Sequence, residues 1–147
     1  MTDKHDYSTT IKVDKTPQEA FDAINNVRGW WGKNIEGNST NSGDEFIFQV
    51  EDVHFSKQKL VEVIPEKKVV WLVTDSRLDF IKDKSEWTGT KINFEISEQG
   101  NKTQVRFTHI GLLPEIECYN ACSNAWRDLV TGNLQSLITT GKDQPMF

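Results

Sequence analysis

The spacing of hydrophobic residues identifies one long helix at the end of the chain, within residues 117–141. Large apolar side chains recur there at helical spacing on one face, namely Trp126, Val130, Leu134, Leu137 and Ile138. A second row, of mostly small side chains, runs beside them: Cys118, Cys122, Ala125, Leu129, Gly132 and Ser136. The opposite face is polar and holds Asn124, Asp128, Thr131 and Thr139. The pattern predicts an amphipathic helix that rests on a sheet and ends at Gly141.

The row of small side chains has two explanations. Either the helix lies very close to the sheet, or a space is left between them. A glycine inside a helix costs about 1 kcal/mol relative to alanine, so Gly132 predicts that a strand or a ligand approaches the backbone there. We expect Trp126 and Leu129 to contact the sheet, and the length of the row favours a cavity.

The first part of the chain predicts one strand followed by two short helices. Residues 7–13 alternate between apolar and polar side chains, as in a strand. Thr16, Pro17 and Glu19 form the pattern of a capping box with proline at the first helical position. A helix is therefore expected to about Asn26, with a second helical turn over residues 28–31.

The middle of the chain predicts antiparallel strands after a polar loop at residues 32–43. The expected strands are 44–50, 53–64, 68–74, 88–97 and 102–110, with a bulge at 57–59 and a hairpin turn at 99–101. Residues 75–85 fit a rim loop, a short strand or a mobile flap. Helices at both ends of a run of strands predict an α+β fold, with a curved antiparallel sheet around the C-terminal helix, in a single domain of residues 1–147. An apolar cavity is expected wherever the helix and the sheet stand apart.

Composition and charge exclude several classes of partner. The 147 residues are 36% hydrophobic and carry a net charge of −5, without a block of Lys or Arg. Nucleic acid is therefore not expected as a partner. The chain has no run of eighteen apolar residues, and residues 1–6 contain no apolar segment of a signal peptide. We expect no membrane insertion and a cytoplasmic protein.

Few residues fit a known chemical motif. The motifs of serine hydrolases, phosphate-binding loops and zinc proteases do not occur, so no catalytic residue is assigned and the sequence leaves open whether a reaction occurs. The two cysteines are expected to be buried free thiols. The three histidines His5, His54 and His109 are too few for a metal site with these cysteines, so no metal and no cofactor are expected.

His109 is the titratable residue of greatest interest. Alternation in its strand points it inward, beside Phe107, and burial is expected to lower its pKa. It is either a general acid or base, a polar anchor for a ligand, or a hydrogen-bonded core residue. His54 lies at an irregular position of its strand and is expected to be exposed. Glu115 and Glu117 are either a carboxylate pair at a cavity rim or favourable charges at a helix N-terminus.

The candidate cavity lining comes from the inward positions of the strands and the helix. Trp71 and Trp126 are expected in the core or the cavity wall, whereas Trp30, Trp31 and Trp87 either cover the mouth, form a partner-binding patch or pack under the short helices. The predicted lining consists of Phe46, Phe48, Trp71, Phe94, Phe107, His109, Cys122, Ala125, Trp126 and Leu129.

Several short motifs, in their order, resemble one superfamily over nearly the whole chain. They are Thr16-Pro17-x-x-Ala20-Phe21, Trp30-Trp31, Leu60-Val61-Glu62-Val63-Ile64-Pro65-Glu66-Lys67 before Val70-Trp71, Gly89-Thr90-Lys91-Ile92, and Thr103-Gln104-Val105-Arg106-Phe107-Thr108-His109-x-Gly111-Leu112. The chain resembles the START/Bet v 1-like (SRPBCC) helix-grip superfamily, and within it is similar to the family of the Aha1 C-terminal domain. The resemblance implies a small cavity for an apolar ligand under the helix. Members of the superfamily include lipid and hormone binders, polyketide cyclases and chaperone partners.

The sequence therefore supports two alternative functions. In the first, the protein binds a small hydrophobic molecule between sheet and helix, as a carrier or sensor. In the second, it is a protein-interaction module, for example a partner of an Hsp90-type chaperone or a protein similar to an ATPase activator, with a role in the stress response.

Overall fold

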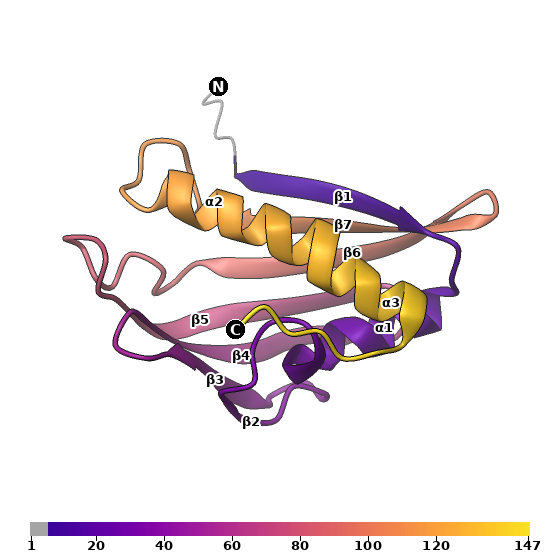
Figure 1. Ribbon diagram of the computed structural model, residues 1–147, viewed down its shortest axis with the longest axis horizontal. Coiled ribbons are helices and arrows are strands. Elements are labelled where there is room, and N and C mark those ends of the chain that lie inside the picture. Colours follow the sequence, from indigo (N-terminus) through magenta and orange to yellow (C-terminus); the bar gives the residue numbers. More distant parts are fainter. Residues whose placement is uncertain (1–5) are drawn as a thin grey trace.

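The computed structural model describes residues 6–147, and these form a seven-stranded antiparallel sheet with helices on one face (Figure 1). The strands are β1 (Tyr7–Val13), β2 (Ile35–Gly37), β3 (Glu45–Val50), β4 (His54–Ile64), β5 (Lys68–Leu78), β6 (Lys91–Gln99) and β7 (Lys102–Ile110). The helices are α1 (Pro17–Asn25), the 3-10 turn η1 (Val27–Gly29), α2 (Tyr119–Asp128), the π-helical turn η2 (Leu129–Leu134) and α3 (Gln135–Thr140). The predicted α+β class, with a curved sheet around a long C-terminal helix, is confirmed.

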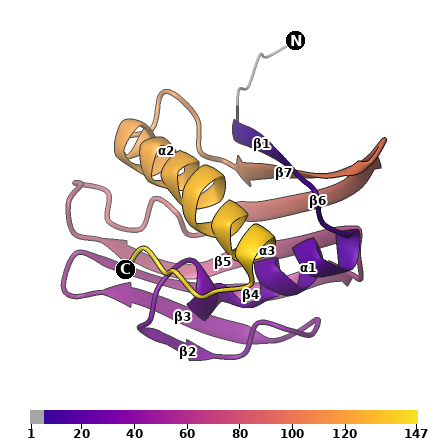
Figure 2. The same cartoon turned by 45° about the vertical axis from the view of Figure 1, so that its right-hand side comes forward.

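The strand order is β1-β7-β6-β5-β4-β3-β2, so β1 and β2 lie at opposite edges of the sheet. The segment with α1 and η1 therefore crosses from one edge to the other. The C-terminal helix runs over the same face, and α3 meets α1 at one end (Figure 2). The last residues turn back from α3 in front of the sheet (Figures 1 and 2). Helices and tail together cover one face, and this face holds the core.

The start of α1 is formed as the sequence predicts. Thr16 Oγ1 accepts a hydrogen bond from the Glu19 backbone N–H, and Glu19 Oε1 accepts one from the Thr16 N–H, both at 3.1 Å. This capping box satisfies backbone donors that a helix start leaves free. The second helical element is η1 (Val27–Gly29), shorter than the turn expected over residues 28–31.

The C-terminal helix has the predicted apolar face, but it begins two residues later than expected and contains the turn η2. Gly141 ends it with a left-handed φ of 74°, a conformation that glycine adopts without steric cost. A π-helical turn inserts one residue and rotates the rest of the helix by about 100°. Gly132 consequently faces solvent, and a methyl group built on it would meet no described atom within 4 Å. The expectation that a strand or ligand approaches Gly132 is therefore wrong.

Aromatic side chains fill the centre of the space between sheet and helix. Trp31 stacks on Trp71 with ring centroids 5.7 Å apart, and Trp30 packs edge-on against Phe94 at 6.0 Å. Trp30 and Trp31 directly follow η1, whereas Trp71 and Phe94 come from the sheet, so the segment after the short helices supplies much of the core. The free space is displaced toward one end of the helix.

The sheet is irregular at that end. β4 changes register against β5 between Lys57 and Gln58, as the predicted bulge at 57–59 requires, and again between Leu60 and Glu62. β5 extends to Leu78, four residues beyond the prediction, but its pairs with β6 span only residues 68–72 of β5. The first part of the uncertain segment 75–85 is thus strand and the rest is loop. The loop 79–90 lies where β5 and β6 are no longer paired.

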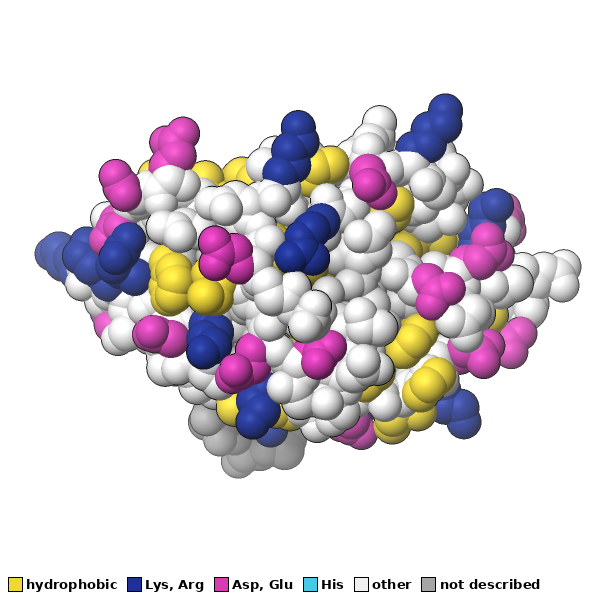
Figure 3. All heavy atoms as spheres, turned by 90° about the horizontal axis from the view of Figure 1, so that it is seen from below, with side chains coloured by type: hydrophobic (Ala, Val, Ile, Leu, Met, Phe, Trp, Pro, Cys, Tyr) yellow, Lys and Arg dark blue, Asp and Glu magenta, His cyan; other side chains and the backbone are white. Residues whose placement is uncertain are grey.

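The loop predicted at residues 32–43 contains the short edge strand β2, which pairs with β3. None of the helices in residues 6–147 combines the length and the apolar character needed to cross a membrane. Acidic and basic side chains are interspersed over the face shown in Figure 3, with small groups of hydrophobic side chains between them.

Candidate ligand-binding cavity

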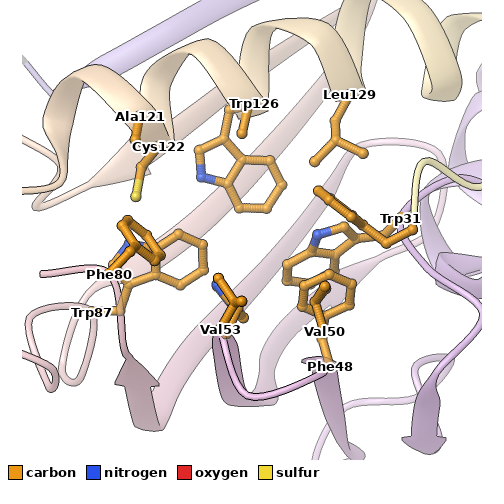
Figure 4. A pocket seen from close by; sticks show the side chains of 13 residues that line it. Trp31, Phe48, Val50, Val53, Phe80, Trp87, Ala121, Cys122, Trp126 and Leu129 are labelled. Carbon is orange, nitrogen blue, oxygen red and sulfur yellow. The ribbon is translucent and has the colours of Figure 1, made fainter.

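A cavity of about 140 Å³ lies between α2 and the ends of β3 and β4 (Figure 4). The helix supplies one wall, and Phe48, Val50 and Val53 face it from the sheet side in Figure 4. The full lining is Trp31, Phe48, Val50, Val53, His54, Phe80, Trp87, Ala121, Cys122, Ala125, Trp126, Leu129 and Phe147. The lining is apolar except at His54.

Half of the lining residues predicted from the sequence meet at this cavity. They are Phe48, Cys122, Ala125, Trp126 and Leu129. The other five, Phe46, Trp71, Phe94, Phe107 and His109, are fully buried in the packed core and do not line the cavity. Their positions point inward as expected, but Trp30 and Trp31 fill the space in front of the central strands.

The flat walls of the cavity are two stacked aromatic pairs. Trp31 lies parallel to Phe48 with centroids 4.1 Å apart, and Trp87 lies parallel to Trp126 at 5.8 Å. Trp30, Trp31 and Trp87 are all buried, so they do not form an exposed patch for a partner. Trp31 and Trp87 are instead cavity walls, and Trp30 packs in the core.

Three exposed apolar side chains surround the cavity mouth. Val53, Phe80 and Phe147 are 47%, 45% and 45% exposed, and each also lines the cavity. Phe147 is held by backbone hydrogen bonds, because its N–H donates to Trp31 O at 3.2 Å and its carbonyl accepts from Lys33 N at 2.9 Å. Sequence reasoning missed Phe147, because it belongs to no helix or strand and no periodicity marks its position.

The loop 79–90 is attached to the start of α2 by backbone-to-carboxylate hydrogen bonds. Glu117 accepts from the backbone N–H groups of Lys82 and Asp83, at 2.9 and 3.2 Å. These hydrogen bonds hold the pKa of Glu117 below its usual range. Glu115 is exposed. Glu117 therefore positions the loop, a role that neither hypothesis from the sequence included.

A second carboxylate completes this attachment in the opposite direction. Glu86, in the loop, accepts from the N–H groups of Glu117 and Cys118 at 2.9 and 3.0 Å. These donors precede the first turn of α2, which has no side-chain cap of its own. We call the hydrogen bonds accepted by Glu117 and those accepted by Glu86 the Glu117 clasp and the Glu86 clasp. Together they hold the loop with Phe80 and Trp87 over the cavity.

His109 is inward and fully buried, as predicted. Its Nδ1 accepts a hydrogen bond from Trp126 Nε1 at 3.0 Å, and its Nε2 donates to Thr90 Oγ1 at 2.8 Å. The direction follows because the indole N–H can only donate and the Thr90 hydroxyl donates to Trp87 O at 2.6 Å. Burial lowers the pKa of His109 to about 3. Both nitrogens are occupied, so the geometry supports the core role and neither catalysis nor ligand contact.

His54 lines the cavity, so the expectation that it is exposed is wrong. Its ring packs edge-on against Phe48 and Trp87 at 5.0 and 4.8 Å. Its Nε2 lies 2.9 Å from Ser56 Oγ, and burial lowers the pKa of the imidazole to about 4. Ser56 is fully buried and does not line the cavity, so a ligand could not reach its hydroxyl as a nucleophile.

The two cysteines are free and buried, as predicted. Cys122 Sγ donates to Cys118 Sγ, which also accepts from Trp87 Nε1 at 3.4 Å. The paired Cys122 thiol and burial raise the pKa of the Cys118 thiol above its usual range, so it remains a protonated, weak nucleophile. Within residues 6–147 no three His, Cys, Asp or Glu side chains are placed to hold a metal ion. His5 lies outside the described residues.

An antiparallel sheet curved around a long C-terminal helix defines the helix-grip class of proteins. No known protein family matches the chain, and no curated protein matches it. Solved structures do match. The solution structure of the Aha1 dimer from Colwellia psychrerythraea is similar with a TM-score of 0.74 and 22% identity, over 94% of this chain and 98% of that one. The protein therefore has an Aha1-like helix-grip fold.

Two other solved structures share the fold. A solution structure of a Bacillus halodurans protein has a TM-score of 0.69 and 16% identity, over 94% of this chain and 99% of that one. DynU16, a protein from the dynemicin biosynthetic locus, has a TM-score of 0.66 and 15% identity, over 92% of this chain but 48% of its own. At these identities the likeness concerns the fold alone.

Proposed function

We propose that the protein binds a small apolar molecule, about the size of one aromatic ring, in the cavity beside α2, as a carrier or sensor. The observation that carries the proposal is a preformed cavity whose lining is apolar except at His54. Apolar cavities of this kind stay dry, and one of about 150 Å³ in another protein binds benzene. Larger ligands occupy pockets of roughly 300–1,000 Å³.

The wall residues support a planar ligand. Trp31 with Phe48 and Trp87 with Trp126 present flat aromatic surfaces, and aromatic rings pack favourably in stacked or edge-on contacts. Ala125 and Cys122 leave the helix side of the cavity open, because their side chains are small and larger ones would occupy the space. No residue is assigned to a reaction, so catalysis is not part of the proposal.

Titration with toluene tests this function. Three cavity walls are tryptophans, so binding should change tryptophan fluorescence with a saturable dependence on toluene concentration. Amide NMR shifts should concentrate in α2, around residues 48–54 and in the loop 79–90. The absence of saturable binding, or shifts concentrated at the distant β6–β7 hairpin, would contradict the proposal.

The exposed rim supports a second candidate, a protein-interaction module. Val53, Phe80 and Phe147 form an apolar rim at the mouth, and one similar solved structure is described as an Aha1 dimer. Phe80→Ser would weaken binding of a protein partner at this rim. Ala125→Leu, inside the cavity, would leave such binding unchanged but would block a small ligand, so the two variants separate the candidates.

A further inference from the structure

His54 is the one polar side chain in the lining of the cavity. It is neutral at pH 7, because burial lowers its pKa to about 4, and therefore carries one N–H and one free nitrogen lone pair. One ring nitrogen, Nε2, is 2.9 Å from Ser56 Oγ. The position of the proton follows from the partners of that hydroxyl.

Ser56 lies between His54 and Gln58 on the inner face of β4. Gln58 Nε2 donates a hydrogen bond to Ser56 Oγ, and within residues 6–147 the one other hydrogen-bond partner of this hydroxyl is His54 Nε2, so the hydroxyl donates its own proton to that nitrogen. The imidazole proton is then on Nδ1. A buried chain of three polar residues thus sets the tautomer of the histidine that lines the cavity.

Nδ1 of His54 has no hydrogen-bond partner within residues 6–147. Nδ1 is also not fully buried. The fully buried polar side-chain atoms without a partner in this part of the chain belong to Asn25, Gln58, Trp71 and Asn93, and Nδ1 of His54 is not among them. The neighbouring Phe48 and Trp87 rings offer no acceptor oxygen to it. His54, which lines an otherwise apolar cavity, therefore has an Nδ1–H donor without an acceptor from the protein.

We propose that His54 Nδ1–H donates a hydrogen bond to an oxygen of the bound molecule, and that the ligand class is a neutral single-ring aromatic with a hydroxyl or carbonyl oxygen. This inference rests on the proposed function. The ligand is neutral because the lining contains no Lys, Arg, Asp or Glu, and an unpaired charge is costly to bury. The apolar walls bind the ring, and His54 selects its orientation.

Phenol and toluene test the inference, because they have nearly the same shape and differ in the oxygen. Dissociation constants of both are measured for the wild type and for His54→Leu, below pH 8 so that phenol stays neutral. A lost hydrogen bond should weaken phenol binding about fivefold to tenfold, whereas toluene should change less than twofold. Toluene thus controls for any change in cavity shape.

The outcomes separate the two proposals. If the wild type binds neither compound, the proposed function fails. If it binds toluene but the ratio of the two dissociation constants is the same in His54→Leu, the function stands and the role of His54 is overturned. If His54→Leu does not fold, long-range ¹H–¹⁵N NMR of the wild type decides. Phenol, but not toluene, should shift the Nδ1 resonance of His54, and equal spectra with both compounds would overturn the inference.

Discussion

The indole N–H of Trp126 donates to Nδ1 of His109 at 3.0 Å, which joins the C-terminal helix to β7. The same indole stacks on Trp87 and forms one wall of the cavity. A buried hydrogen bond of this kind fixes the height of the helix above the sheet as well as its rotation. The helix cannot slide along the sheet without leaving the Trp126 and His109 groups unpaired, so this hydrogen bond keeps the helix in place beside the open cavity.

Replacement of Trp126 should be strongly destabilising. Trp126→Ala removes a fully buried ring and leaves His109 without its donor, so the free energy of unfolding should fall by roughly 3–5 kcal/mol. Trp126→Phe keeps most of the ring and should cost about 1–3 kcal/mol, chiefly for the unpaired nitrogen. Urea denaturation measures both. A loss below about 1 kcal/mol for Trp126→Ala would place the side chain outside the core.

Stability should fall as the pH is lowered from about 7 to 5. The folded-state pKa values of His109 and His54, about 3 and about 4, lie below the value of about 6.5 expected in the unfolded chain. The unfolded state therefore binds protons first, so the stabilisation is complete above about pH 6.5 and declines as the pH falls.

Urea midpoints at about pH 7.5 and about pH 5 measure this dependence. The glutamine in His109→Gln can keep both hydrogen bonds without titrating. If this variant folds, its urea midpoint should therefore depend less on pH than that of the wild type. A wild-type midpoint that does not change between the two pH values would show that these histidines are not shielded.

The Glu117 clasp should control the mobility of the loop 79–90. Glu117→Gln weakens the acceptors for the amides of Lys82 and Asp83, so these amides should exchange faster with deuterium. Glu115→Gln is the matched control, because Glu115 is exposed, and should leave their exchange unchanged. In the wild type, exchange corrected for the intrinsic pH effect should rise only at a pH below the usual range of a glutamate, because the backbone hydrogen bonds from Lys82 and Asp83 lower the pKa of Glu117. Equal exchange in both variants would contradict the clasp.

Regular periodicity was sufficient to predict most of the fold. Alternation in residues 102–110 placed His109 inward, and helical spacing placed Trp126 on the buried face, because both segments keep one period throughout. The same rule failed at Gly132, although it correctly placed Val130, Leu134, Leu137 and Ile138 on the buried face. A π-helical turn changes the phase of the helix, and nothing in a count of about 100° per residue signals that Gly132 turns to solvent.

The position of His54 was missed for a different reason. Its neighbours on the inner face of β4 are Ser56 and Gln58, which have the polarity of solvent-facing residues. The register of β3 against β4 would have located His54. Phe48 pairs with Ser56, so an inward Phe48 requires an inward Ser56, and His54 shares the face of Ser56. The cavity itself depends on which rings fill the centre, and the packing of Trp30 and Trp31 is set by tertiary contacts far apart in the sequence.

Ala125→Leu tests the central claim, that an open apolar cavity beneath α2 binds the ligand. Ala125 lines the cavity, so the larger side chain should fill it, with stability unchanged or higher and toluene affinity reduced at least about tenfold. Asn124→Leu makes a similar change at the neighbouring exposed position and should leave toluene binding intact. If Ala125→Leu instead lowers the free energy of unfolding by roughly 1–3 kcal/mol, as overpacking of a dense core does, and toluene affinity does not change, the claim of a ligand-binding cavity is contradicted.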